Sequence, residues 1–165
     1  MGTRAPRKSR ATTKKDPDTT AAAPELPSHE AYAEFIAGVE LRDIRLTETH
    51  ATSKASRFDT DALQVKIDVR SGIERIAGQE LPSFEAHVTL DLEATDADGH
   101  ERATITSTYA LLYESKIEPT DGMLEIFLNL NVSVNAWPYL REHVQGTITR
   151  FGWNPLILPP LKTLR

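Results

Sequence analysis

The feature that most constrains the fold is a pair of segments in which apolar and polar residues alternate. The first segment covers residues 84–93 and the second covers residues 103–113. Such a period of two is typical of a β-strand with one buried face. Only a short loop joins them, and it contains the turn sequence Asp-Ala-Asp-Gly at residues 96–99. The two segments therefore predict an antiparallel β-hairpin.

Two further strands precede this hairpin. Residues 63–70 alternate in the same way. Nearer the N-terminus, Ile44, Leu46, Glu48 and His50 share one side of a strand, whereas Leu41 is out of phase, so a β-bulge is predicted near residues 42–43. The connections are too short for parallel crossovers. The sequence predicts a four-stranded antiparallel sheet with one apolar and one polar face.

Helices are expected at both ends of this strand region. Ser28 has the properties of an N-cap for a short helix over residues 29–37. Residues 123–134 are apolar, and their pattern fits either a strand or a helix. Pro138 is predicted to open a long helix, which Gly152 ends. The fold class is therefore α+β, with the C-terminal helix covering the apolar face of the sheet.

Charge divides the chain into two parts. The whole chain has a net charge of −5, from 19 basic and 24 acidic residues. Residues 1–28 hold six basic and three acidic residues and no aromatic, which leaves 13 basic and 21 acidic residues, a net −8, in residues 29–165. Residues 1–28 contain too few apolar side chains for their burial to offset the conformational entropy lost on ordering this segment. We predict a disordered basic tail over residues 1–28 and one folded domain over residues 29–165.

Several classes of protein are excluded by what the sequence lacks. There is no cysteine, the five histidines have no helical metal-site spacing, and neither a glycine-rich phosphate loop nor a nucleophile elbow is present. We therefore expect no enzyme, no cofactor and no metal. No apolar run approaches the roughly 20 residues of a spanning helix, and no secretion signal is visible, so we expect a cytoplasmic protein. An acidic body also repels nucleic acid.

Aromatic residues are concentrated near the C-terminus. Five of the 11 aromatics lie in the last 39 residues, including both tryptophans. They flank residues 153–161, an apolar segment whose three prolines prevent it from continuing a helix. Such a segment docks into the core, forms an oligomer interface, or remains partly open as a binding surface. Composition alone leaves these three alternatives open.

Three motifs in this region resemble the SecB export-chaperone family. They are residues 135–142 (NAWPYLRE), residues 149–150 (TR) and residues 155–160 (PLILPP), in the order and spacing of that family. Residues 39–46 (VELRDIRL) are similar to the start of the first strand in SecB-like proteins found beside toxin–antitoxin pairs. Export members carry a second helix after the proline motif, whereas only four residues follow Leu161. This difference and the basic tail place the chain nearer to the atypical, toxin–antitoxin-associated branch.

The resemblance implies a fold and an activity. Family members have a four-stranded antiparallel sheet with helices on one face, and they assemble as tetramers that are dimers of dimers. They are ATP-independent holdases, which bind unfolded client chains in apolar surface grooves. In the export branch the acidic face of the sheet binds the SecA motor, and in the other branch the client includes an antitoxin.

The resemblance also assigns residues to three surfaces. The expected client-contact residues are Phe58, Phe127, Trp153, Leu156, Ile157, Leu158 and Leu161. The expected helix-to-helix oligomer interface contains Trp137, Tyr139, Arg141, Val144 and Ile148. The candidate acidic docking face comprises Glu85, Asp91 and Glu93, for which an ordinary solvated strand face is the alternative.

Three functional hypotheses follow. The first is a holdase for non-native or aggregation-prone chains. The second is a binding protein on the same fold that is dedicated to one partner, such as a toxin–antitoxin component. The third is a small enzyme or ligand-binding domain, for which the sequence offers no converging polar residues.

Overall fold

A computed structural model describes residues 25–54 and 63–161 of the chain. The predicted disorder of the basic tail therefore concerns residues that lie mostly outside the described part. The elements are, in chain order, α1 (His29–Gly38), β1 (Val39–Ser53), β2 (Gln64–Ile76), β3 (Ser83–Thr95), β4 (Glu101–Ser115), α2 (Asp121–Phe127), the π-helix η2 (Leu128–Val132) and α3 (Ser133–Arg150).

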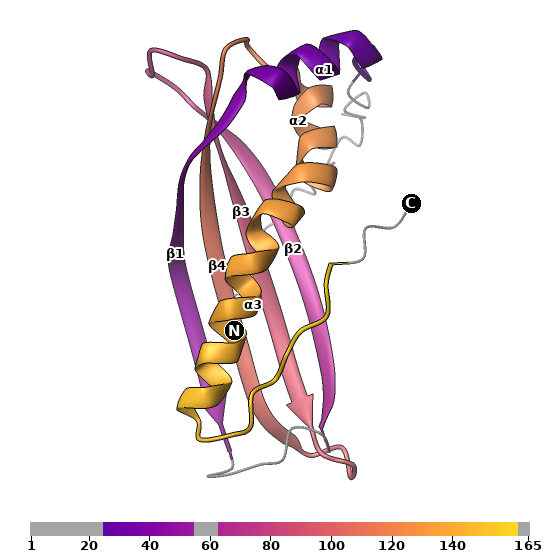
Figure 1. Cartoon of the computed structure of the whole chain (residues 1–165), viewed down its shortest axis with the longest axis vertical. Helices are drawn as coiled ribbons and strands as arrows, with labels where there is room; N and C mark the ends of the chain where they lie inside the picture. The colour runs from indigo at the N-terminus through magenta and orange to yellow at the C-terminus, as the bar shows by residue number, and fades with distance from the viewer. Residues whose placement is uncertain (1–24, 55–62, 162–165) are drawn as a thin grey trace, which may run out of the picture.

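The four strands form one antiparallel sheet in the order β1-β4-β3-β2 (Figure 1). β3 and β4 form the predicted hairpin. The antiparallel sheet together with the helices at both ends of the strand region confirms the predicted α+β fold class. The hairpin turn is closed by the Asp96 carboxylate, whose Oδ1 accepts hydrogen bonds from the main-chain N–H groups of Asp98 and His100 at 3.0 and 2.9 Å. Gly99 has a φ of +82°, a conformation that glycine adopts without a steric cost.

The helices lie on one face of the sheet and leave the other face open (Figure 1). The short helix α1 lies at one end of the sheet and is capped as predicted, because the Ser28 hydroxyl accepts a hydrogen bond from the Ala31 N–H at 3.2 Å. The segments α2, η2 and α3 form one continuous helical run along the sheet. No helix in the described residues is both long enough and apolar enough to span a membrane.

The start predicted for the long helix is wrong. Pro138 lies inside α3 and does not open it, because the ambiguous residues 123–134 are helical and already belong to the run. Proline removes one helical hydrogen bond, but Pro138 is exposed, where water can solvate the carbonyl that is left without a partner. Gly152 ends the helix as predicted, with a φ of +79°.

The core lies between the helical run and the apolar face of the sheet. At the end near α1 it contains four rings, from Phe35, Phe84, Tyr113 and Phe127, with neighbouring centroids 4.9–6.1 Å apart. The Phe84–Tyr113 pair is stacked and the other pairs are tilted or edge-on, and such pairs add stability beyond simple burial. The alternating residues of β3 and β4 continue this core along the sheet.

The strand β1 contains two irregularities, of which only one was predicted. The register with β4 shifts between Leu41 and Asp43, which confirms the predicted bulge. A second shift lies between Leu46 and Glu48, where the Thr47 hydroxyl donates to the Thr108 carbonyl at 3.1 Å.

The second bulge reverses the faces of the rest of β1. Thr49 is opposite Ser107 on the helix-covered face, and its hydroxyl contacts the Ser107 hydroxyl at 3.2 Å and His143 Nε2 at 3.0 Å. Glu48 and His50 consequently lie on the open face. The prediction that they share a face with Ile44 and Leu46 is wrong.

Candidate functional site

Residues 153–161, which we term the strap, run back along α3 after the chain turns at Gly152 (Figure 1). The strap begins beside the end of α3, where the main-chain N–H of Trp153 donates to the Ile148 carbonyl at 3.4 Å. Near its other end, the Trp137 indole N–H donates to the Pro159 carbonyl at 3.0 Å. Since Trp137 lies about three turns before Ile148 on α3, the strap and the helix are antiparallel.

Side-chain burial is the main force that holds the strap in place. Trp153 and Leu158 are only 4% and 2% exposed and belong to the core. In residues 154–161 the described hydrogen bonding is limited to the bond between Trp137 and Pro159. The three prolines have no N–H to donate, which favours an extended segment without sheet pairing. The strap is therefore held against the helix mainly by two buried side chains, Trp153 and Leu158.

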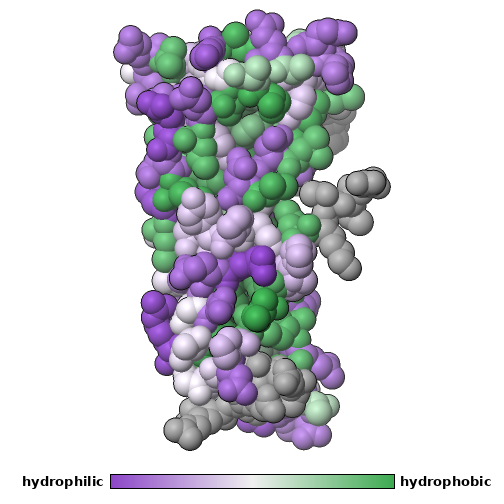
Figure 2. All heavy atoms as spheres, viewed as in Figure 1, coloured by the Kyte–Doolittle hydropathy of each residue, from purple (hydrophilic) through white to green (hydrophobic). Residues whose placement is uncertain are grey.

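The outward side of this region exposes large apolar side chains. Ile157 on the strap is 69% exposed, and Leu130 and Val134 on the helical run are 53% and 49% exposed. Leu130 and Val134 lie one turn apart, and Val134 is followed three residues later by Trp137, which binds the strap. We call Leu130, Val134, Trp137, Leu156 and Ile157 the apolar surface. Figure 2 shows hydrophobic side chains emerging in patches beside this helical run, between hydrophilic ones.

The edge strand β2 continues the apolar character beside the helices. Ile67 and Val69 are opposite the buried Leu92 and Leu90 of β3, so they lie on the helix-covered face. Both are half-buried, because β2 pairs with β3 alone among the described strands. An unpaired strand edge can accept main-chain hydrogen bonds from an extended peptide.

The predicted client-contact residues divide into three groups. Phe127, Trp153 and Leu158 are buried in the core of this structure. Leu156 and Leu161 are half-buried, and Ile157 is exposed. Phe58 lies outside the described residues. Sequence reasoning missed Leu130 and Val134, because the ordinary helical period places positions 130 and 134 on the same side as the buried Phe127.

The predicted interface residues also have different environments. Val144 and Ile148 are fully buried against the sheet, and Arg141 is half-buried. Tyr139 is exposed, and its ring centroid is 6.2 Å from that of Tyr109 on β4. Of these predicted interface residues, Tyr139 therefore lies on the surface near β1, whereas Val144 and Ile148 belong to the core.

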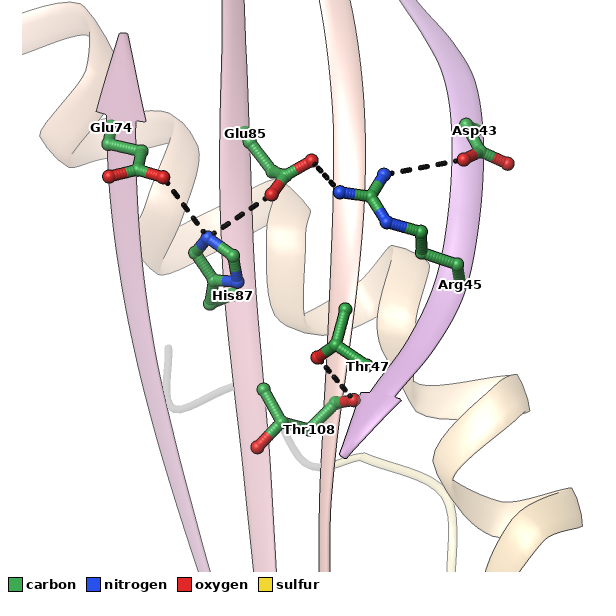
Figure 3. Close-up of polar contacts among 7 residues, drawn as sticks. All are labelled: Asp43, Arg45, Thr47, Glu74, Glu85, His87 and Thr108. Carbon is green, nitrogen blue, oxygen red and sulfur yellow. Dashed lines mark hydrogen bonds and ion pairs between the residues drawn. The ribbon is translucent and has the colours of Figure 1, made fainter. Parts of the chain in front are cut away.

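The predicted acidic face is partly neutralised by arginines. Glu85 Oε2 accepts a hydrogen bond from Arg45 at 2.6 Å, and Asp91 is paired with Arg70 (Figure 3 shows the first pair). Hydrogen bonds from Arg70 and then from the Thr106 hydroxyl lower the pKa of the Asp91 carboxyl below its ordinary value. Glu93 is exposed. The open face is thus a surface of mixed charge with Glu93 as its most accessible predicted acid.

Polar residues that could act chemically are few in the described part of the chain. Two groups bring possible metal-ligand atoms within 4.8 Å of one another: Glu74, Glu85 and His87, and separately Asp96, Asp98 and His100. Neither group is beside the apolar surface, since the first lies on the open face of the sheet and the second in the β3–β4 turn.

One of three comparisons with known proteins identifies the fold. No family model matches the chain, and no curated protein does. A solved structure of the Mycobacterium tuberculosis Rv1957 SecB-like chaperone, in complex with a ChAD peptide from the Rv1956 HigA1 antitoxin, matches with a TM-score of 0.72 and 23% sequence identity. The match covers 83% of this chain and 100% of that chain. The chain therefore has the fold of the SecB-like chaperone, as the sequence motifs predicted.

Proposed function

We propose that this chain is an ATP-independent holdase, which binds non-native or aggregation-prone polypeptides on its surface. The observation that carries the proposal is the apolar surface on a SecB-like fold. Leu130, Val134 and Ile157 are about half-exposed or more, although each could have been a polar residue at no cost to the core. A holdase requires such a surface and needs no reaction centre.

Binding of an extended client follows from two properties of this region. Burial of apolar side chains is non-directional and contributes about 25 cal/mol per Å², so many client sequences are accepted. Main-chain groups of the client can pair with the edge of β2, which adds affinity without sequence preference. The net −8 of residues 29–165 keeps a particle with exposed apolar groups soluble by self-repulsion.

The strap has a supporting role in this proposal. Ile157 contacts clients directly, and the half-buried Leu156 and Leu161 lie at the margin of this contact. Trp153 and Leu158 are buried in the core and hold the strap in position. Phe127 acts indirectly, through the packing of the helical run.

The partners proposed for this chain are client polypeptides. The similar Rv1957 structure holds an antitoxin peptide. An aggregation-prone antitoxin is accordingly the specific client that we propose. Docking of the SecA motor is the less favoured alternative, because two of the three predicted docking acids are already paired with arginines. We further propose a cytoplasmic homotetramer, built as a dimer of dimers, that uses no cofactor.

Suppression of aggregation tests the proposal. The full chain, without nucleotide, should suppress light scattering by a chemically unfolded client near equal molar amounts. The double variant Leu130→Ser, Val134→Ser should lose most of this suppression with an unchanged melting temperature. Leu81→Ser is the matched control, since Leu81 is also exposed but lies in the β2–β3 connection. No suppression by the parent chain at several-fold excess would contradict the proposal.

The same assay separates the holdase from a protein dedicated to one partner. A holdase should protect several unrelated clients, and the Leu130→Ser, Val134→Ser variant should fail with all of them. A dedicated partner protein should bind one antitoxin tightly and leave the unrelated clients to aggregate.

A further inference from the structure

A cluster on the open face of the sheet, remote from the apolar surface, has the geometry of a metal site. His87 on β3 lies between Glu74 of β2 and Glu85 of β3 (Figure 3). His87 Nε2 is 3.4 Å from Glu74 Oε1 and 3.3 Å from Glu85 Oε1. All three ligand atoms lie within 4.8 Å of one another.

Hydrogen bonding alone leaves this cluster incompletely satisfied. One imidazole nitrogen carries at most one proton, so Nε2 can donate to only one carboxylate at a time. Both distances also exceed the usual 2.9–3.0 Å of an N–H···O hydrogen bond. Moreover, Glu74 is directly opposite Glu85 in the β2–β3 register, and like charges in that position destabilise a strand pair.

The same distances fit a tetrahedral cation. Zinc ligands at about 2.0–2.1 Å from the ion lie about 3.3–3.4 Å from each other. A divalent ion in place of the imidazole proton would bind His87 and both carboxylates and would relieve the repulsion between Glu74 and Glu85. One imidazole and two carboxylates suit zinc and other first-row divalent metals, whereas calcium and magnesium prefer oxygen ligands alone.

The surroundings hold the ligands in place and leave room for an ion. Arg45 donates to Glu85 Oε2 at 2.6 Å, which directs Oε1 toward His87, and Arg45 Nη1 is 3.4 Å from Asp43. Such outer contacts orient metal-binding carboxylates. The position opposite His87 on β2 is Gly72, and a Cβ there would meet no atom within 4 Å. Solvent can therefore supply the fourth ligand.

The second group of possible ligands does not share these properties. Asp96 Oδ1 accepts two main-chain N–H groups, and its Oδ2 accepts Arg102 Nε at 2.8 Å. Both oxygens of the Asp96 carboxylate thus already accept hydrogen bonds within the β3–β4 hairpin.

We propose that Glu74, Glu85 and His87 form a binding site for a divalent transition-metal ion, for which zinc is the probe. The site joins the edge strand β2 to β3, so metal binding stabilises the sheet edge. This proposal is independent of the holdase activity.

Calorimetric titration of the full chain with zinc chloride tests the site. One ion should bind per chain, and His87→Gln and Glu74→Gln should each weaken binding at least tenfold. His50→Gln is the matched control, because His50 lies on the same open face of the sheet and should leave the affinity unchanged. Cobalt(II) should give the intense visible absorption of a tetrahedral complex.

Thermal melting provides a readout that does not depend on calorimetry. Zinc should raise the melting temperature of the parent chain and of His50→Gln but not that of Glu74→Gln. Glu74 is exposed, so its replacement preserves the fold even if the His87 variant is unstable. Absence of saturable binding, or equal binding by the parent and both site variants, would show an ordinary His–Glu ion pair and overturn the proposal.

Discussion

Asp96 shows how a single side chain determines a turn. Its carboxylate accepts two main-chain N–H groups and the Arg102 guanidinium. The hydrogen bond from the His100 N–H, followed by Arg102, lowers the pKa of Asp96 to about 2. Because the folded state favours the charged carboxylate, this stabilisation is present above about pH 4, the unfolded pKa, and is lost as the pH falls toward 2.

Asp96→Asn should therefore destabilise the chain at neutral pH and matter little in acid. Urea denaturation of the parent and the variant between pH 7 and pH 2.5 measures the difference, which should shrink as the pH falls. Asp98→Asn is the control, since the Asp98 carboxyl is in the same turn but is exposed. A difference between parent and Asp96→Asn that is the same at every pH would contradict this account.

Phe127 provides a second test at the residue scale. It is 3% exposed and contacts the rings of Phe35, Phe84 and Tyr113. Phe127→Ala should lower the free energy of unfolding by about 3–5 kcal/mol through the cavity it leaves. Leu130→Ala on the outer side of the run should change it by less than about 0.5 kcal/mol. Loss of client protection by Phe127→Ala without loss of stability would mean that Phe127 contacts clients directly.

At the scale of elements, the strap depends on alternate burial of neighbouring residues. Leu158 is in the core, whereas Ile157 beside it points outward. Leu158→Ser should release the strap and raise the acrylamide quenching of tryptophan fluorescence, because Trp153 belongs to the strap and is buried in its docked position. Ile157→Ser makes a closely similar chemical change and should leave quenching unaltered while weakening client binding. Equal quenching in the two variants would argue that Leu158 is not an anchor.

The elements also explain what the sequence could and could not predict. The hairpin of β3 and β4 was predictable, because each strand keeps its own alternation and the turn has its own sequence signature. The second bulge of β1 was not, since residues 47–50 (TETH) are all polar and carry no alternation that would reveal a change of face. The shift depends on the contact of Thr47 with a carbonyl of β4, 61 positions away along the chain.

The helical run was obscured by its π-helical segment. Phe127 and Val132 are both buried although they are five residues apart, and from Val132 the buried positions recur every four residues. The five-residue step belongs to the i→i+5 turn of a π-helix, which is rare enough to defeat a search for the ordinary period. This step also hid the outward direction of Leu130 and Val134, the residues of the candidate site that the sequence did not predict.

At the scale of the whole molecule, the two faces of the sheet serve different purposes. The covered face builds the core, and its margins expose the apolar surface. The open face is polar, is bound together by arginine–carboxylate pairs, and holds the proposed metal site (Figures 1 and 3). The proposed client binding and the proposed metal binding should therefore be separable by mutation.

The side of the molecule that carries β1 is suited to self-association. Leu46 is opposite Tyr109 in the β1–β4 register, and the Tyr139 ring lies beside the Tyr109 ring, so Tyr109 has an exposed side chain on either side. The proposed tetramer should have a mass of about 74 kDa, four times the 18.4 kDa of one chain, by light scattering. Leu46→Glu with Tyr139→Glu places like charges in the contact and should reduce the mass, whereas Leu81→Glu should not. A parent chain of about 18 kDa, or an unchanged mass in the double variant, would exclude this surface as the interface, because an obligate contact cannot tolerate two buried unpaired carboxylates.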